Sequence, residues 1–370
     1  MAQKIVALIP AYNEAQSIGA TIEALLVQTR PLDTIVVIPN GCTDNTAEVA
    51  RSYMSRSASV VVLELPKLEH KKSEALNRAW NAHARDADIV ISVDADTIFD
   101  PNAIELWEGD FKGVLRRKRH YKPLGGSAAK ATMPKTGFWD RLQKAEFAKS
   151  VDASLLRGFT TVLPGAGAAF YNAALRRIVD ETGREGPWSY TSAVEDFELT
   201  VQLRKRGYLC IASPRVRMYT DSMSSLRTMW DQRMKWSTGT IDDLISLGVT
   251  RLTLVDWGQQ LLGGFMVFVR VLWLVLIGLQ IFVGIFQFHW FWWLVYPLLF
   301  VGSEAYLSLR IPNPDWKDRV LAITILPYEI FGWIRTAWFV AAWYEVLTAR
   351  ITGQQKDRWE LQYHSEGVSG

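Results

Sequence analysis

The first hundred residues alternate between short apolar runs and amphipathic segments, and this alternation constrains the fold more than any other feature of the chain. The apolar runs cover residues 5–9, 34–38, 60–63 and 89–93. They have the length of strands and lack polar alternation, as is typical of a sheet that is covered on both faces. Because strands that alternate with helices favour parallel pairing, we expect an α/β domain with helices on both faces of a parallel sheet.

Helices are expected between these runs. Ser17 can cap the first of them. Its apolar residues recur at helical spacing and are Ile18, Ile22, Leu25 and Leu26. Two more helices are expected, one from about residue 45 and one over about residues 72–83.

Composition divides the chain into two halves of different character. Residues 1–225 read as a soluble protein, whereas residues 257–347 are dense in Trp, Phe, Leu and Val. The formal net charge is only +3, so the chain has no overall signature of nucleic-acid binding. Cys42 and Cys210 form no metal-binding spacing, and two cysteines suit a reducing compartment. No signal peptide is expected, because the chain opens directly into its first strand.

The sequence Asp94-Ala95-Asp96 follows the apolar run 89–93 directly. Open α/β sheets bind ligands at the edge where their strands end, and cations with phosphate partners are usually held by one or two carboxylates. An isolated pair of this kind is more often an ordinary acidic loop, in which Asp96 or Asp100 caps the next helix. The surroundings of the pair therefore decide between these interpretations.

Three further loops bring unusual side chains to the same predicted edge. They are residues 10–14 with Tyr12, residues 39–44, and the Lys71-Lys72 pair. Each alone is ordinary turn chemistry, since Asn, Gly and Asp are common in turns. Together they offer an aromatic group for a base, carboxylates and amides for a ribose, and cations for phosphate. We therefore expect a nucleotide site.

Two motifs lie downstream. Ser192 and Glu195 have capping-box spacing, which accounts for Glu195 but leaves Asp196 unexplained. A carboxylate at Asp196, projecting into a cleft, could take a proton from an attacking hydroxyl. The sequence Gln232-Arg233-Met234-Lys235-Trp236 precedes the apolar half, and alone it would indicate an amphipathic interfacial helix.

Three motifs, taken in their order along the chain and ahead of an apolar C-terminal region, resemble the motifs of family 2 glycosyltransferases. They are Asp94-Ala95-Asp96, Glu195-Asp196 and Gln232-x-x-Lys235-Trp236. The closest likeness is to the membrane-bound branch that includes hyaluronan, chitin, cellulose and poly-N-acetylglucosamine synthases. It covers about residues 4–240 and implies a GT-A fold, a Rossmann-like α/β nucleotide-sugar-binding domain followed by membrane helices. The implied organisation is a catalytic domain at 1–225, interfacial helices at 226–256, transmembrane or re-entrant helices at 257–347 and a cytoplasmic tail at 348–370.

The resemblance implies a role for individual residues. Those implied in donor binding are Ala11, Tyr12, Glu14, Asn40, Asp44, Lys72, Asp94, Gln232, Lys235 and Trp236. Those implied at the acceptor are Gly165, Ala166, Gly167 and Trp236. Asp96, with Asp94, is implied as the ligand of Mn²⁺ or Mg²⁺. Asp196, with Glu195 beside it, is implied as the catalytic base, and Asn77 is implied near the diphosphate.

Two departures from the family pattern matter. Asn40 stands where an acidic residue is usual; an amide both donates and accepts, so uracil is favoured while guanine and thymine stay open. Lys235 stands where Arg is usual, and Lys lacks the planar fork that grips a diphosphate through two bonds. Arg233 lies nearby, but on a helix it points away from Lys235.

The resemblance implies a membrane-attached, metal-dependent, inverting glycosyltransferase that moves sugar from a nucleotide sugar to an acceptor hydroxyl, with a UDP-sugar favoured. Its acceptor would be a carbohydrate, a lipid or a protein, so single-sugar transfer is an alternative to polysaccharide synthesis. A few helices cannot enclose a glycan channel within one chain, although a homo-oligomer could. The alternative from another class is a non-catalytic, sugar-nucleotide-binding membrane protein.

The apolar half is expected to lie in the cell membrane and to contact lipid. Residues 258–288 carry one charge, Arg270, whose insertion costs about 2.5–3.5 kcal/mol, and the run is long enough to span. Residues 290–309 are a second candidate. Basic residues flank this pair, which predicts a multi-pass protein with its catalytic domain on the cytoplasmic side. Residues 320–347 are interrupted by charges and predict a re-entrant or interfacial helix pair. The basic run 116–122 could face lipid headgroups or a phosphate-bearing acceptor, or be a solvated helix end.

Overall fold

The computed structural model describes residues 3–113, 122–285, 314–354 and 356–367, together with 287, 302, 305, 306, 309 and 311. The chain forms two compact units. The first comprises Met1–Lys135, Ser150–Ser222 and Glu366–Gly370, and the second comprises Thr136–Lys149 and Met223–Ser365. The finer division into a catalytic domain, interfacial helices, membrane helices and a tail stays a prediction.

The first unit is built on one mixed sheet. Within the described residues its strands are β1 Ile5–Ala11, β2 Thr34–Pro39, β3 Val60–Val62, β4 Ile89–Val93, β5 Ile98–Phe99, β6 Leu124–Thr132, β7 Gly167–Tyr171 and β8 Leu209–Tyr219. They lie in the order β3-β2-β1-β4-β7-β6-β8-β5. The four apolar runs of the sequence are thus β1 to β4, which pair in parallel as expected.

The expectation of a wholly parallel sheet is wrong for the second half. Strand β7 runs antiparallel to both β4 and β6, and β5 runs antiparallel to β8. Strands β6 and β7 are rich in Gly and Ala and lack a β-branched run, so no pattern in the sequence marks them. The reversal has a consequence for the site: it pairs Gly167, at the start of β7, with Val93, at the end of β4.

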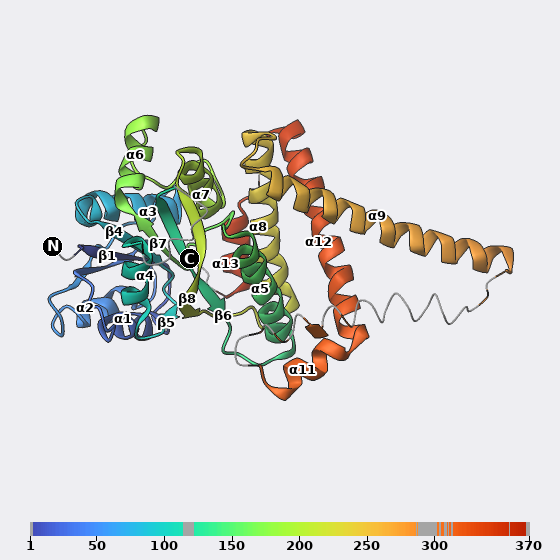
Figure 1. Ribbon diagram of the computed structural model, residues 1–370, viewed down its shortest axis with the longest axis horizontal. Helices are drawn as coiled ribbons and strands as arrows, with labels where there is room; N and C mark the ends of the chain where they lie inside the picture. Colours follow the sequence, from blue (N-terminus) through green and yellow to red (C-terminus); the bar gives the residue numbers. More distant parts are fainter. Residues whose placement is uncertain are drawn as a thin grey trace. The chain divides into compact units, whose positions relative to one another are not determined.

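Helices cover both faces of the sheet, as the sequence predicts. They are α1 Ile18–Leu26, α2 Thr46–Ser52, α3 Lys71–Ala79 with the π-helical turn η1 Trp80–Ala84, α4 Ala103–Phe111, α6 Asn172–Thr182 and α7 Glu195–Lys205. Leu76, Trp80, Leu175 and Leu199 bury α3, α6 and α7 against the strands in one apolar cluster. Figure 1 shows α1, α2 and α4 on the other side of the strands.

Ser17 does not cap α1 through its side chain, in contrast to the expectation. Ser17 occupies the position before the helix, but its hydroxyl caps no backbone amide of the helix. It donates instead to the Glu14 carboxylate at 2.5 Å and to the Glu14 carbonyl at 3.2 Å. Ser17 therefore fixes a side chain of the first predicted nucleotide loop.

The second unit is helical within the described residues. Its helices are α8 Leu226–Leu247, α9 Leu254–Val283, α11 Trp316–Ile323, α12 Ile325–Thr352 and α13 Arg358–Ser365, joined by the beginning of α5 Phe138–Arg157, whose later part belongs to the first unit. Met229, Met234, Phe331 and Trp338 form the centre of an apolar cluster between α8 and α12.

One helix in the described part of the chain is long and apolar enough to cross a membrane: α9, with 30 residues and an unburied apolar stretch. Helices α11 and α12 are bent by 74° where they meet and pass the same test only as a pair, as a broken span or a re-entrant loop would. Most of the candidate 290–309 and the basic residues 116–120 lie outside the described residues.

Arg270, the single charge of the first candidate span, is paired within the second unit. Its guanidinium donates to the Gly332 carbonyl at 2.8 Å and to the Thr336 hydroxyl at 2.7 Å on α12. A Cβ at Gly332 would lie 2.2 Å from the guanidinium, so α9 and α12 approach closely at this glycine. These bonds reduce the cost of placing an arginine in an apolar helix.

Candidate functional site

The Asp94-Ala95-Asp96 turn is fixed by neighbours on both sides. The Asp94 amide donates to the Ala166 carbonyl at 3.3 Å. The Thr21 hydroxyl of α1 donates to the Ala95 carbonyl at 2.8 Å. Because β4 is parallel to β1 and ends at Val93, the two carboxylates stand at the carboxyl edge of the parallel strands, as the sequence predicts.

Lys72 joins this turn to the second acidic motif. Its ammonium lies 2.5 Å from Asp94 Oδ1 and 3.6 Å from Glu195 Oε1. Burial disfavours the charged ammonium, but the carboxylates of Asp94 and Glu195 outweigh it and hold the Lys72 pKa above its ordinary value. Lys72 is therefore a permanent cation that links two motifs more than a hundred residues apart.

The Asp196 carboxylate lies in the first turn of α7, beside this ion pair. It accepts from the Gly165 amide at 3.2 Å and from the Phe197 amide at 2.8 Å. Burial raises the Asp196 pKa, while the positive charge of Lys72 and the two amides act in the opposite direction. A carboxylate with a raised pKa is a stronger base than an exposed one, which suits proton abstraction.

Helix α7 does not begin where the capping-box spacing of Ser192 and Glu195 predicts. Helix α7 begins at Glu195 after Val194, and no side chain caps it. The Ser192 hydroxyl instead accepts from the Val194 amide at 3.1 Å. The Glu195 carboxylate lies within ion-pair distance of Lys72.

The small-residue segment 165–167 lies between the two acidic motifs. The Ser92 hydroxyl donates to the Gly165 carbonyl at 3.0 Å, and Gly165 and Ala166 supply the backbone contacts to Asp196 and Asp94. A Cβ at Gly165 would lie 2.9 Å from the Lys72 ammonium. The segment therefore needs glycine for the close approach of Lys72, independently of any acceptor.

Gly165→Ala is expected to lower the rate of sugar transfer about tenfold while leaving the fold intact. The new methyl group displaces only the end of a flexible side chain, so the ammonium shifts away from Asp94 and Glu195 but the backbone does not move. The measurements are kcat and the melting temperature. Gly109→Ala in α4 is the control, because its Cβ would meet nothing closer than 3.7 Å. Equal rates for wild type and Gly165→Ala would contradict this account of the glycine.

Asp96 is the carboxylate of this site best suited to bind a cation. It accepts from the Thr97 hydroxyl at 3.3 Å and the Thr220 hydroxyl at 3.4 Å, and no described cation lies within ion-pair distance. Burial, followed by the charges of Asp94 and Asp221, raises its pKa to about 6. A half-buried carboxylate without a cationic partner fits a divalent ion.

No group of three or more His, Cys, Asp or Glu side chains within the described ranges has the geometry of a metal site. Asp96 and Asp94 therefore stay predicted ligands. That number is typical of sites in which substrate phosphates supply further oxygens.

The first two nucleotide loops are tied together through Asn13 and Asp44. The Asn13 side-chain oxygen accepts from the Thr43 amide at 2.7 Å. The Asp44 carboxylate accepts from the Ala15 amide at 3.1 Å and from the Thr46 amide at the start of α2 at 3.0 Å. These bonds outweigh burial and lower the Asp44 pKa. The geometry gives Asp44 a structural function, and its predicted contact with the donor stays a prediction.

Asn40, Glu14 and Ala11 line the same edge. The Asn40 side-chain oxygen accepts from the Leu68 amide at 3.2 Å, and the Ala11 carbonyl accepts from the Asn40 amide at 2.9 Å. Burial, with the charges of Asp96 and Asp94 acting in the same direction, raises the Glu14 pKa to about 7 against its bond from Ser17. Tyr12, between them in the sequence, is half-buried.

The third motif belongs to α8 in the second unit. The Lys235 ammonium lies 3.4 Å from the centre of the Trp359 ring on α13. Arg233 stands 4.5 Å from the Trp236 ring, donates to the Gln232 side-chain oxygen at 2.8 Å and pairs with Glu146 at 2.7 Å. Arg233 is thus engaged elsewhere and does not replace the missing arginine at Lys235.

The side chain of Asn77 does not face an open site. It is buried and bonds the backbone of Trp188, and its place near the diphosphate stays a prediction. The available signal was its position among the apolar residues of α3, where a polar side chain needs buried partners. Ser92 and Thr220 were missed altogether, because a single serine in a strand, or a single threonine just after one, carries no pattern.

Two family models match the chain. Glycosyl transferase family 2 matches residues 6–107, and Glycosyl transferase family group 2 matches residues 89–303, which is more than half of the chain. The poly-beta-1,6-N-acetyl-D-glucosamine synthase of Staphylococcus aureus (strain COL) is 26% identical over 237 residues, 63% of this chain and 53% of the synthase. The synthase of the same name from Staphylococcus epidermidis is 24% identical over 238 residues, with the same coverage. The chain spans about half the length of the curated relatives it matches.

Among solved structures, a mannosyltransferase from Pyrobaculum calidifontis in complex with GDP-Man and Mn²⁺ is similar to this chain. Its TM-score is 0.56 at 16% sequence identity, over 94% of this chain and 88% of that one. The likeness shows a shared fold and agrees with the mixed α/β sheet described above.

Proposed function

Because the chain belongs to the family 2 glycosyltransferases and is therefore a glycosyltransferase, we propose that it is membrane-attached and moves a sugar, with inversion, from a nucleotide sugar to an acceptor hydroxyl. The observation that carries the proposal is the cluster around Lys72. Its ammonium bridges Asp94 and Glu195, and Asp196 lies in the same turn of α7 as Glu195. A non-catalytic binding protein would not need a half-buried carboxylate beside this ion pair.

Asp196 acts as the base in this reaction. It takes the proton of the acceptor hydroxyl as that oxygen bonds to the anomeric carbon of the donor sugar. The bond between the anomeric carbon and the diphosphate oxygen breaks, and the nucleoside diphosphate leaves with the electron pair. The amides of Gly165 and Phe197 hold the carboxylate in one orientation throughout.

Asp96 and Asp94 hold a divalent cation, Mn²⁺ or Mg²⁺, in this proposal. A cation bound there would neutralise the charge that builds on the leaving diphosphate. Lys72 orients the Asp94 carboxylate, and it holds Glu195 beside Asp196. The similar mannosyltransferase is in complex with Mn²⁺, which supports a divalent ion here.

We propose a carbohydrate acceptor and hence a part in polysaccharide synthesis. The curated relatives are poly-beta-1,6-N-acetyl-D-glucosamine synthases, although the match covers about half of their length. Asn40, whose amide nitrogen can donate to a base, favours a UDP-sugar. Transfer of a single sugar to a lipid or protein is the alternative.

Membrane attachment is proposed through α9. Its apolar side chains include Leu261, Phe265, Phe268 and Trp273, which are exposed within the second unit. An apolar surface of this length is unfavourable in water and suits a bilayer. The charge pattern of the sequence supports a multi-pass arrangement with the catalytic unit on the cytoplasmic side.

A panel of sugar nucleotides tests the function. The chain, purified in detergent or nanodiscs, would be incubated with UDP-GlcNAc, UDP-glucose and GDP-mannose in Mn²⁺, with an oligosaccharide acceptor. Release of nucleoside diphosphate together with a lengthened or newly glycosylated product supports the proposal. Tight donor binding without either product for every donor would favour the non-catalytic alternative.

Lys235 is expected to contribute one positive charge to the diphosphate. Lys235→Met should weaken binding of the nucleoside diphosphate about tenfold, whereas Lys235→Arg should bind at least as tightly as wild type, because the guanidinium restores the two-bonded grip. Calorimetric titration measures both. Lys112→Met, at the exposed end of α4, is the control. Unaltered affinity in Lys235→Met would remove this residue from the donor site.

A further inference from the structure

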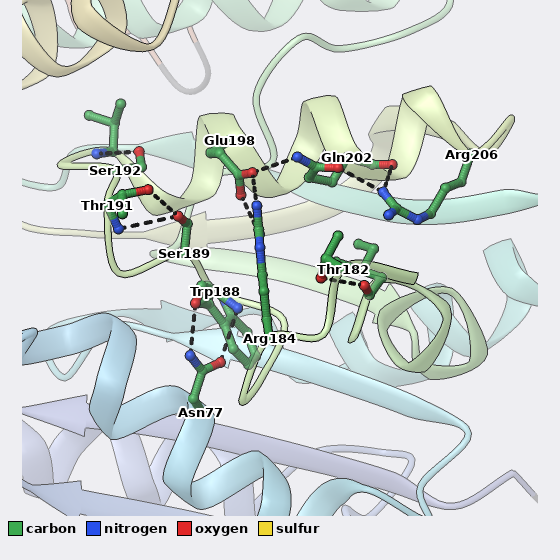
Figure 2. Close-up of polar contacts among 12 residues, drawn as sticks. Asn77, Thr182, Arg184, Trp188, Ser189, Thr191, Ser192, Glu198, Gln202 and Arg206 are labelled. Carbon is green, nitrogen blue, oxygen red and sulfur yellow. Dashed lines mark hydrogen bonds and ion pairs between the residues drawn. The ribbon is translucent and has the colours of Figure 1, made fainter. Parts of the chain in front are cut away.

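The segment 183–194 joins α6 to α7 and leads directly into Glu195 and Asp196. It has neither helix nor strand, yet residues 186–189 are buried and side chains fix it along its length (Figure 2). We call residues 183–194 the strap. The strap and the residues that it contacts all belong to the first unit.

The central anchor of the strap is Asn77 of α3. Its side-chain nitrogen donates to the Trp188 carbonyl at 2.7 Å, and its side-chain oxygen accepts from the Trp188 amide at 3.0 Å, as Figure 2 shows. Asn77 and Trp188 are each 2% exposed, so neither backbone group has water as a substitute partner. A Cβ at Gly186 would lie 2.3 Å from Asn77 Oδ1, so the strap is pressed against the amide.

Two more contacts extend this anchor along the same helix. The Asn81 side-chain nitrogen donates to the Glu185 carbonyl at 2.7 Å. His70, just before α3, stacks on Tyr190 with ring centres 4.5 Å apart and planes 6° from parallel. Helix α3, its preceding residue His70 and the following turn η1 therefore hold the strap at three points, Tyr190, Trp188 and Glu185.

Short local bonds pass this constraint from Trp188 to the first turn of α7. The Ser189 hydroxyl accepts from the Thr191 amide at 3.3 Å, and the Ser192 hydroxyl accepts from the Val194 amide at 3.1 Å (Figure 2). Glu195 and Asp196 follow Val194 directly. Because Lys72 also belongs to α3, the helix that anchors the strap is the one whose ammonium meets Glu195.

The beginning of the strap is tied to α7 instead of α3. The guanidinium of Arg184 donates two bonds to the Glu198 carboxylate, at 2.5 and 3.0 Å, and Gln202 continues the row (Figure 2). This contact stabilises the strap, but it does not fix the position of α7 relative to α3. It therefore provides a matched control for the anchor at Asn77.

We propose that Asn77 is a positioning residue for catalysis: through the backbone of Trp188 it sets where Glu195 and Asp196 stand relative to Lys72. The inference rests on the proposed function, which gives Asp196 the role of base. Asn77 touches neither donor nor acceptor. Its effect is confined to the step that needs the base in place, and the affinity for the donor does not depend on it.

Asn77→Asp is the variant that tests this. The carboxylate has the shape of the amide and still accepts from the Trp188 amide, but it cannot donate to the Trp188 carbonyl and repels it. We expect kcat to fall about 10- to 100-fold, since misplacing a catalytic group by about 1 Å has effects of this size. The dissociation constant for the donor should stay within about twofold of the wild-type value. Arg184→Gln should lower the melting temperature but keep kcat within about twofold.

A second comparison separates positioning from general weakening of the fold. In the Asp196→Asn background, Asn77→Asp should cause no further loss of transfer, because the base that it positions is already absent. An equal fold-loss in both backgrounds would overturn the proposal, as would a wild-type kcat in Asn77→Asp or a loss confined to donor affinity. If Asn77→Asp does not fold, Tyr190→Ala replaces it, with the same outcomes.

Hydrogen exchange keeps the inference independent of the proposed function. Peptides covering residues 186–196 should exchange faster in Asn77→Asp than in wild type. In Asn81→Asp, the exchange rates of residues beyond Glu185 should equal those of wild type. Unchanged exchange in residues 186–196 of Asn77→Asp would overturn the proposal even if no substrate is known. Absence of turnover in the wild-type protein, by contrast, would count against the proposed function alone.

Discussion

Asp196→Asn is expected to bind the nucleotide sugar as wild type does and to transfer sugar about a hundred- to ten-thousand-fold more slowly. The amide has the size of the carboxylate and can still accept from the Gly165 and Phe197 amides. It cannot take a proton from the acceptor hydroxyl. The measurements are single-turnover transfer and, separately, donor affinity by calorimetry. Asp180→Asn on the exposed face of α6 is the control.

The pH dependence of the wild-type rate gives an independent check on the same residue. Burial raises the Asp196 pKa above the ordinary Asp value, so the base form is present above the raised pKa and transfer falls as the pH drops through it. Asp196→Asn should lack this decline. A variant that transfers sugar at the wild-type rate, with the same acidic decline, would show that another group is the base.

Asp96→Ala is expected to remove metal-dependent donor binding. Changes to the partners of metal ligands typically cost about 10- to 100-fold in metal affinity, so loss of the ligand itself should cost about a hundredfold or more. Titration of Mn²⁺ in the presence of nucleoside diphosphate measures the effect. Asp86→Asn, at an exposed carboxylate, is the control.

The fold of Asp96→Ala should not suffer. Burial and neighbouring carboxylates raise the Asp96 pKa, so the folded protein without a cation is strained by this charge and removing it is neutral or stabilising. A melting temperature equal to or above that of wild type, together with lost Mn²⁺ affinity, is the expected pair of results. Unaltered Mn²⁺ affinity would assign the cation to other residues.

The parallel half of the sheet was predictable because the residues of each strand carry the pattern that identifies it. Strands β1 to β4 are apolar runs between amphipathic helices, and burial on both faces requires that pattern. Strands β6 and β7 were not predictable, since glycines and alanines permit close packing but form no pattern that indicates a strand. Their pairing with β4 and β8 is a tertiary property. It was also what brought Gly165 and Ala166 to the acidic turn, which no local pattern could foretell.

The site was predictable in its residues more than in its geometry. The motifs singled out Lys72, Asp94, Glu195 and Asp196, and the first unit brings these four together. That Lys72 bridges two carboxylates depends on ion-pair distances between segments far apart in the chain. The bonds of Asn77 could not be predicted for a similar reason: spacing gave its place on α3 but not the backbone of Trp188 that it contacts.

The contacts of Glu195 and Asp44 show what local sequence patterns leave out. Ser192 and Glu195 have the spacing of a capping box, but Lys72 offers Glu195 a full opposite charge, which a helix amide does not. Asp44 was expected to bind the donor; its carboxylate accepts from backbone amides at the start of α2 and in the first loop, and its contact with the donor stays a prediction. A carboxylate takes the strongest donors within reach, and only the folded chain shows which these are.

The most direct test of the central claim is anomalous diffraction at the manganese edge from crystals of the chain with Mn²⁺ and an unreactive nucleotide-sugar analogue. The account predicts a manganese peak coordinated by Asp96 and diphosphate oxygens, with the Asp196 carboxylate on the side of the anomeric carbon opposite the diphosphate. Manganese and donor bound away from Asp96, or an Asp196 on the same side as the diphosphate, would contradict it.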